Sequence, residues 1–255
     1  MKPRLIALAI IVVYGMVRMP IEANLAREQK KLHYHGATLN LDMRQRLGQD
    51  GFIAALSGFR ALVADVLWLQ AHAAWQRTEW GRMKVLFDTI TALQPRNVMF
   101  WDMAAWHMAY NASVAAHEDN SQPREALRLR AEREYWKLGE DFLLRGIQNN
   151  PDRALLYENL GMIYRDKFND HEKSAWAYGE AAKRPDAKQY VHRFAVYELA
   201  KVPGREREAY TRLKALYDKG EEERLPTLEK LLGELEEKLN VPAEQRTYIP
   251  PSKHP

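Results

Sequence analysis

The residues of this chain best suited to chemistry are its eight histidines. Two flank a tyrosine in His33-Tyr34-His35, and His72 and His107 follow farther along. Two histidines three or four residues apart on a helix could ligate one metal ion, but the chain has no such pair and no His-Glu-x-x-His motif. His33 and His35 would share a face only in a strand. We therefore expect no resident metal.

His107 is the most informative histidine because polar groups gather around it on an otherwise apolar stretch. Trp106 precedes it, and Tyr110 and Asn111 follow about one helical turn later. The main interpretation is a hydrogen bond satisfied within the core, since buried polar groups are nearly always paired. A metal- or haem-carrying accessory protein that uses the Trp106 and His107 region is the alternative.

Other catalytic chemistries lack the residues that they need. The chain has no cysteine, which excludes disulfides, thiolate metal sites, iron–sulfur clusters, covalently attached haem and cysteine nucleophiles. Residues 47–51 lack the Lys-Ser/Thr pair of a phosphate-binding loop, and no Gly-x-Ser-x-Gly elbow occurs. Its many glutamates are typical of solvated helix surfaces. We therefore expect a protein that is not an enzyme and has no cofactor.

The composition describes a folded chain with little net charge. Hydrophobic residues make up 46% of its 255 residues and aromatic residues 10%, which argues against disorder. Its net charge of +4 is the difference between 38 basic and 34 acidic residues. Charges of both signs alternate in runs such as 124–134, whereas a nucleic-acid surface needs segregated basic residues. We expect no nucleic-acid partner.

An apolar run follows a short basic start at the N-terminus. Lys2 and Arg4 precede residues 5–17, which contain no charged side chain. As a helix this run rises about 20 Å, short of the roughly 30 Å hydrocarbon core, so a span would extend over 1–21 with Arg18 reaching to the interface. The expected membrane contacts are Leu5, Ile6, Leu8, Ile10, Ile11, Val12, Val13 and Val17.

We interpret this segment as a retained signal-anchor, or transmembrane, helix. The sites after Val17 fit the small-residue cleavage rule poorly, which favours retention. A cleaved signal and a helix packed within protein are the alternatives. A basic start before an apolar run is typical of exported bacterial chains, so we predict a single-pass protein of the bacterial inner membrane with its bulk in the periplasm. Basic residues on both sides leave the reverse orientation open.

The rest of the chain divides into a connector, a helical region and a tail. Residues 22–50 are polar with weak periodicity, and 240–255 form a Pro-rich extended tail. Between them, over 51–239, apolar residues recur three and four apart between glycines and prolines. This pattern predicts helices over 51–57, 59–77, 79–93, 97–117, 123–149, 153–167, 170–183, 186–200, 204–218 and 225–239. The last has leucines on one face and Glu and Lys opposite, as in a terminal cap.

Two apolar features of the helical region have more than one interpretation. Residues 51–59 combine large apolar and small side chains, so they would cap the helical stack or lie against a membrane or a subunit. Several tryptophans cluster early in the region, where core positions are the main interpretation and an interface hot spot the alternative. These are Trp68, Trp75, Trp80, Trp101 and Trp106.

A repeat underlies these helices. Tyr157-x2-Leu160-Gly161-x2-Tyr164, followed by Ala175-x3-Gly179-x2-Ala182, resembles the first and second helices of a tetratricopeptide repeat. Half-motifs of the same kind are Phe87-x2-Ile90-x4-Pro95, Trp101-x2-Ala104-Ala105-x2-Met108, Gly139-x3-Leu143-x2-Gly146-x4-Pro151, Tyr190-x2-Arg193-Phe194-x2-Tyr197 and Ala209-x3-Leu213-x2-Leu216. The resemblance to the tetratricopeptide repeat superfamily covers roughly 60–218, with an insertion around 117–123.

The resemblance implies an all-α fold, a right-handed α-solenoid of helical hairpins that binds partners on its concave surface. First-helix positions line that surface. Carried over to this chain, they are Met99, Asp102, Trp106 and Tyr110 in the second unit, Leu155, Glu158, Met162 and Arg165 in the third, and Lys188, Val191, Ala195 and Glu198 in the fourth.

This mixed lining indicates the kind of partner. Charges of both signs beside methionine and aromatic side chains suit a peptide or a partner helix better than a phosphate backbone. We therefore expect a non-enzymatic scaffold or accessory subunit that joins other protein subunits in a membrane-associated envelope complex. Besides the metal or haem carrier, a secreted peptide-binding module is a further alternative.

Overall fold

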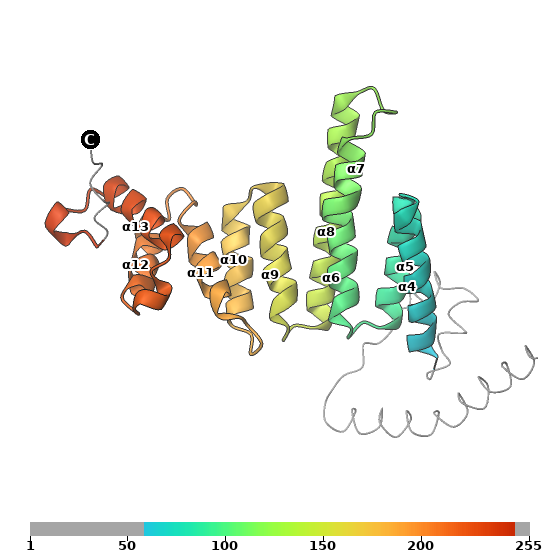
Figure 1. Ribbon diagram of the computed structural model, residues 1–255, viewed down its shortest axis with the longest axis horizontal. Coiled ribbons are helices and arrows are strands. Elements are labelled where there is room, and N and C mark those ends of the chain that lie inside the picture. The colour runs from blue at the N-terminus through green and yellow to red at the C-terminus, as the bar shows by residue number, and fades with distance from the viewer. Residues whose placement is uncertain (1–58, 248–255) are drawn as a thin grey trace, which may run out of the picture. The chain divides into compact units, whose positions relative to one another are not determined.

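The computed structural model describes residues 59–247, and every regular element in that range is helical (Figure 1). The all-α fold class expected from the sequence is thereby confirmed. The chain divides into two compact units, residues 1–104 and 105–255. The predicted anchor over 1–21, the connector over 22–50, the helix over 51–57 and the end of the tail lie outside the described residues. Within 59–247, no helix is both long and apolar enough to cross a bilayer.

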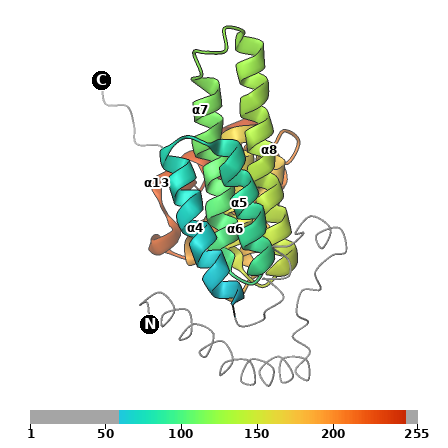
Figure 2. The same cartoon turned by 90° about the vertical axis from the view of Figure 1, so that its right-hand side faces the viewer.

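The first unit contains a helical hairpin. Helix α4 (Arg60–Gln76) and helix α5 (Trp80–Leu93) lie side by side in both views (Figures 1 and 2). The ring of Trp68 packs edge-on against Phe87 at 5.8 Å between centroids and lies 5.5 Å from Phe100 on the next helix. Small, fully buried residues on α4 face this core: Ala64, Ala71 and Ala74.

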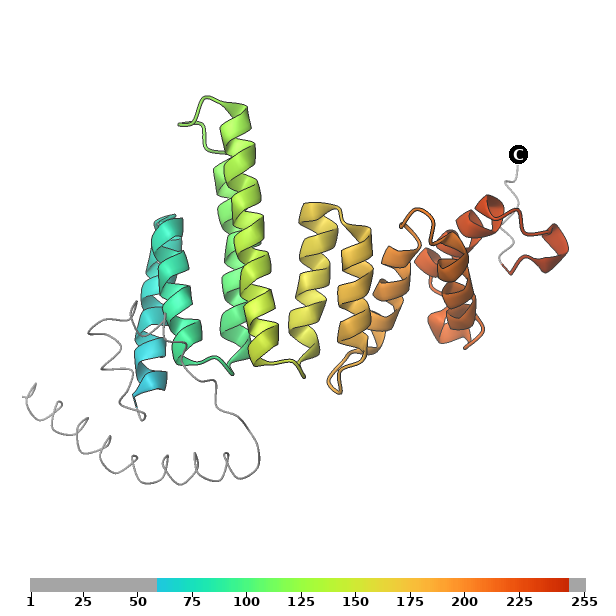
Figure 3. The same cartoon turned by 180° about the vertical axis from the view of Figure 1, so that it is seen from behind.

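The second unit contains the larger set of helices. In chain order they are the end of α6 (Val98–Trp106), η1 (His107–Ala112), α7 (Ser113–His117), α8 (Glu125–Asn149), α9 (Ala154–Ile163), η2 (Tyr164–Phe168), α10 (His171–Ala182), α11 (Gln189–Leu199), α12 (Glu206–Tyr217), η3 (Glu221–Glu223), α13 (Pro226–Lys238) and η4 (Ala243–Gln245). Each packs mainly against the helices before and after it in the chain (Figure 3). The hairpin of α7 and α8 extends beyond α9 and α10 (Figure 1).

The helix boundaries agree closely with those predicted from the sequence. Pro95, Pro151, Pro185 and Pro203 each lie in a connection between two helices, because proline cannot supply the backbone donor that a continuing helix needs. The longest departure is at the start of α11, which begins three residues after the predicted position 186. An apolar periodicity of three and four residues that is followed by a proline therefore predicts these helices correctly.

Two π-helical segments were not predicted. The predicted helix over 97–117 is continuous, but its middle, η1, is π-helical, and the predicted helix over 153–167 ends in η2, also π-helical. Such segments occur often at functional sites. At η1, the Ser113 hydroxyl donates to the backbone oxygen of Ala109 at 2.6 Å. At η2, the backbone N–H of Asp170 donates to the oxygen of Tyr164 at 2.9 Å.

Glycines let neighbouring helices of the second unit approach closely. The ring of the fully buried Tyr178 lies over Gly161, so that a β-carbon at Gly161 would be 3.0 Å from that ring. The Ser174 hydroxyl donates to the Gly161 carbonyl at 2.8 Å. On α8, a β-carbon at Gly139 would lie 2.6 Å from the Ala109 side chain. These contacts explain two glycine positions of the repeat pattern, 139 and 161.

Helix α13 covers the C-terminal end of the described helices. Leu228, Leu232 and Leu235 are buried against Leu213 and Leu216 of α12. The predicted leucine face extends one residue too far at each end of the helix. Leu225 precedes α13 and is exposed, and Leu239 follows its last residue. Pro226 occupies the first turn of α13, where its missing N–H costs nothing.

We predict that Gly139→Ala destabilises the protein whereas Gly179→Ala does not. The added methyl at Gly139 would meet the Ala109 side chain at 2.6 Å and the Ala105 carbonyl oxygen at 2.9 Å, and such overpacking costs about 1–3 kcal/mol. Nothing lies within 4 Å of the same methyl at Gly179, so the higher helix propensity of alanine should stabilise by about 0.5–1 kcal/mol. Urea unfolding of both variants measures this. Equal midpoints would contradict the close contact between α8 and η1.

Candidate functional site

Of the residues predicted to line the concave surface, two belong to the first unit. Met99 and Asp102 both lie on α6. The Met99 side chain is 53% exposed, an unusual position for a methionine, and Asp102 is half-buried. Met99 is therefore available to a partner on that unit.

In the second unit, the predicted residues Trp106 and Tyr110 form an aromatic stack. Their ring centroids are 4.4 Å apart and their planes differ by 20°. The hydroxyl of Tyr110 donates to Asp166 Oδ2 at 3.2 Å, and Lys167 Nζ lies 4.3 Å from the Tyr110 ring centroid. Asp166 and Lys167 belong to η2, whereas Tyr110 belongs to η1. The two π-helical segments are therefore joined through Tyr110.

Arg165, another predicted residue, completes this cluster. Its Nε donates to Asp166 Oδ1 at 2.6 Å, and Nη2 lies 3.3 Å from Oδ2. The carboxylate of Asp166 thus accepts from both Arg165 and Tyr110. We call the side chains Trp106, Tyr110, Arg165, Asp166 and Lys167 the aromatic–charged cluster. Sequence reasoning missed Asp166 and Lys167, although the run Arg165-Asp166-Lys167 is a visible charge signal, because an α-helical register would spread it around the helix.

Burial and charge shift the pKa values of three side chains of the cluster. Burial, followed by the Asp166 charge and hydrogen bond, raises the pKa of Tyr110 well above its usual 10.0. The hydrogen bond to Asp166 raises the pKa of Arg165, and burial lowers the pKa of Lys167. At neutral pH the cluster therefore presents a neutral phenol that donates to the side chain of Asp166. Its geometry positions side chains for contact and contains no nucleophile–base pair.

The third predicted set joins α9 to α11. Leu155, Glu158 and Met162 are half-buried on α9. Glu158 accepts a short hydrogen bond from the hydroxyl of Tyr190 on α11. Burial and this bond raise the pKa of Tyr190 to about 12. The exposed Lys188 approaches the same ring, with its Nζ 5.7 Å from the centroid. A second tyrosine–carboxylate hydrogen bond, from Tyr190 to Glu158, therefore connects α11 to α9.

Three of the four residues predicted in the fourth unit face the core instead of a surface. Val191 is fully buried, where it packs with Tyr157 and Tyr178, and Ala195 is 7% exposed. Glu198 is 3% exposed and lies 2.7 Å from His171 Nδ1 and 2.8 Å from Lys201 Nζ. These three residues cannot line an open surface. The physical reason is that the inner side of α11 packs against α10.

The structure gives His107 a side-chain hydrogen-bond partner, as the main interpretation expects, but leaves it half-buried and outside the core. Asn111 lies one helical turn away, and its Nδ2 is 2.9 Å from His107 Nδ1. His72 likewise lies 3.3 Å from Gln76 Nε2 on α4. Within 59–247, no three His, Asp or Glu side chains are grouped to hold a metal ion.

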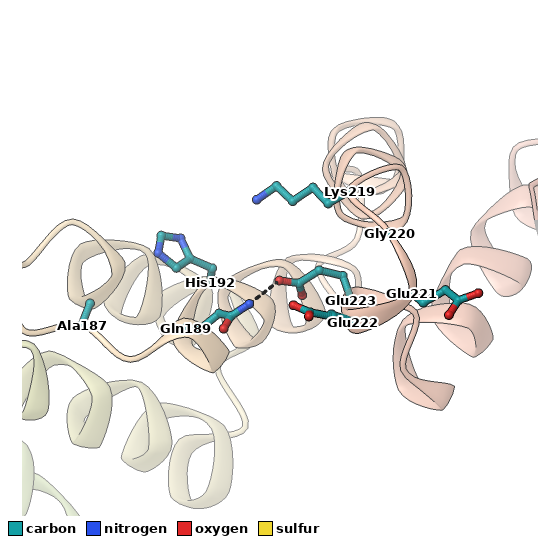
Figure 4. A pocket seen from close by; sticks show the side chains of 8 residues that line it. All are labelled: Ala187, Gln189, His192, Lys219, Gly220, Glu221, Glu222 and Glu223. Carbon is teal, nitrogen blue, oxygen red and sulfur yellow. Dashed lines mark hydrogen bonds between the residues drawn. The ribbon is translucent and has the colours of Figure 1, made fainter.

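Two depressions of the second unit were not predicted. One, of about 680 Å³, lies between the start of α11 and residues 219–223 (Figure 4). Glu223 at its edge accepts from Gln189 at 3.1 Å and from Arg193 at 3.0 Å, and the Arg193 bond lowers the pKa of Glu223. The other, of about 650 Å³, lies beside the exposed Trp176 on α10. Neither depression contains a member of the aromatic–charged cluster.

We predict that Tyr110 stays neutral in alkaline solution while the protein is folded. Its folded-state pKa is raised above 10.0, so its contribution to stability is complete below pH 10 and is lost as the pH rises further, when the unfolded chain ionises first. A phenolate absorbance titration should show that folded protein ionises later than protein in urea. Tyr110→Phe should remove one late-titrating group and lower the free energy of unfolding by about 1 kcal/mol. Coinciding folded and unfolded curves would contradict the Tyr110–Asp166 bond.

Comparison of the chain with known proteins identifies no relative. No protein-family model, curated protein or solved structure matches the chain. The function of the chain is therefore inferred from its own residues, contacts and charges.

Proposed function

We propose that this chain is a non-enzymatic protein–protein interaction scaffold, or an accessory subunit, of a membrane-associated complex in the bacterial envelope. In this proposal the described helices are part of a right-handed α-solenoid of tetratricopeptide type, and a partner binds its first-helix surface. Two features support this architecture. Helices of the second unit pack mainly against their neighbours in the chain, as in solenoids, and two glycines of the repeat pattern, Gly139 and Gly161, lie at close helix contacts.

The aromatic stack of Trp106 on Tyr110 is the observation that carries the proposal. Trp106 is 43% exposed, and tryptophan is among the residues that contribute most to protein interfaces. Its ring is held from behind by Tyr110, which is fixed in turn by Asp166 and Lys167. A side chain that is already ordered loses less conformational entropy on binding. The stack is therefore a preorganised contact for an apolar or aromatic side chain of a partner.

The charges near the stack indicate a polypeptide partner. Arg165 is paired with Asp166 in the cluster, and Lys188 and Glu158 both contact Tyr190 farther along. A surface for a phosphate backbone would carry an unpaired excess of positive charge. An aromatic centre with a polar margin of both signs is the usual composition of a protein interface. This surface suits a peptide or a helix of another subunit.

The membrane location rests on the N-terminal sequence. Residues 5–17 are apolar and follow Lys2 and Arg4, the arrangement of a bacterial signal-anchor. A single anchor with the helices in the periplasm would hold the chain at the membrane. The partner would then be a membrane protein or a protein held at the same membrane.

We predict that Trp106→Ala abolishes partner capture, whereas Trp176→Ala retains it. The two tryptophans are similarly exposed, at 43% and 52%, but Trp176 lies on α10, outside the cluster. Loss of an interface tryptophan typically costs about 2 kcal/mol or more, roughly a thirtyfold loss of affinity. The measurement is crosslinking in native membranes followed by affinity purification of the full-length chain and quantification of the co-purifying proteins.

This comparison separates binding at the stack from general loss of structure. Both variants should unfold at midpoints close to that of the wild-type protein, because each removes an exposed ring. Equal capture by the two variants would reject the cluster as the binding surface. A full-length chain that captures no protein at all would reject the scaffold role.

A further inference from the structure

Helix α4 is apolar on both of its sides. Its core side carries the buried Ala64, Ala71 and Ala74. On the opposite side, Leu62, Val66 and Leu69 are 50%, 48% and 68% exposed. Their spacing of four and three residues puts them on one face of the helix. We call these three residues the outer stripe. A helix that is apolar all round is typically covered on both sides.

A lipid surface is a poor occupant for the outer stripe. Helices that lie on a membrane carry lysine and arginine beside their apolar face, because anionic headgroups attract them. Between Arg60 and Arg77, α4 has no basic residue of this kind, and its ionisable side chains there are Asp65 and His72. The charge around the stripe therefore does not favour a membrane.

A second copy of the chain is also a poor occupant. A stable interface buries about 800 Å² on each partner, and three aliphatic side chains on one helix supply much less. The neighbouring exposed residues, such as Asp65 and Gln70, are polar and do not extend the stripe. An occupant that is already attached to the chain needs far less area, because it loses little translational freedom on packing.

The chain supplies such an occupant directly before α4. Residues 51–57 are apolar and have helical spacing, with Phe52, Ile53 and Leu56 on one face. A helix of this length rises about 10 Å, the same as the rise from Leu62 to Leu69. If residues 51–57 are helical, a connection of only two residues, 58–59, favours an antiparallel neighbour.

We propose that residues 51–57 form a short helix that packs antiparallel on the outer stripe and caps the first unit. In this arrangement Leu56 contacts Leu62, and Ile53 contacts Val66. The N-terminal segment would then be joined to the helices by a packed contact instead of a free connector. The inference is independent of the partner-binding role proposed for the second unit.

The experiment uses the absence of cysteine from the chain. Ile53→Cys and Val66→Cys together introduce the only two thiols, in the full-length protein held in detergent micelles. Mild oxidation should give an intramolecular disulfide, detected as faster migration without reductant, because the two α-carbons would lie within roughly 7 Å. The matched control pairs Ile53→Cys with Val85→Cys, since Val85 is equally apolar and 61% exposed but lies on α5. The control should not form this disulfide.

A double-mutant cycle decides the result if the thiols are poorly oriented. Ile53→Ala and Val66→Ala should each lower the unfolding midpoint, and the double variant should lower it by less than the sum of the two shifts. A disulfide in the test pair alone, or non-additive shifts, supports the cap. A disulfide-linked dimer overturns it in favour of a second copy. Additive shifts without an intramolecular disulfide overturn it as well.

Discussion

The contact on which the second unit most depends is that of the Tyr178 ring with Gly161. A single helix of this unit has an apolar face that it cannot bury alone, so each helix needs its neighbours. Glycine at 161 brings the backbone of α9 against a ring from α10 that is fully buried. The Ser174 hydroxyl then satisfies the Gly161 carbonyl, which water no longer reaches. The large Tyr178 ring, the absence of a β-carbon at Gly161 and the hydrogen bond from Ser174 together fix the distance between α9 and α10.

This fixed spacing positions the aromatic–charged cluster. Residues 164–168 continue directly from α9 as a π-helical segment, so the place of α9 determines where Asp166 lies. Asp166 accepts from Tyr110, and Glu158 accepts from Tyr190. In both cases a neutral phenol donates to a carboxylate, and burial helps to keep the phenol protonated. Such bonds are stronger than bonds between neutral groups, and they join helices that are far apart in sequence.

Sequence could predict the helices because their signals are local. Apolar residues three and four apart and the prolines at 95, 151, 185 and 203 are visible within one short window. The π-helical segments were missed because one additional residue in a turn barely alters that spacing. Glu198 was placed on a surface because nothing near it reveals its partner, His171, 27 residues earlier. Trp106 and Tyr110 were found because their spacing on one helix is itself local.

The first and the last α-helix of the described residues, α4 and α13, differ in their outer faces. The terminal unit of a helical repeat protein needs a polar outer face to remain soluble. Helix α13 meets this need, because Leu228, Leu232 and Leu235 are buried while Lys230 and Glu234 face solvent. Helix α4 does not, since apolar side chains occupy its outer side as well as its core side. The sequence of α4 is therefore that of an interior helix, which supports the proposed packing of residues 51–57 on its outer stripe.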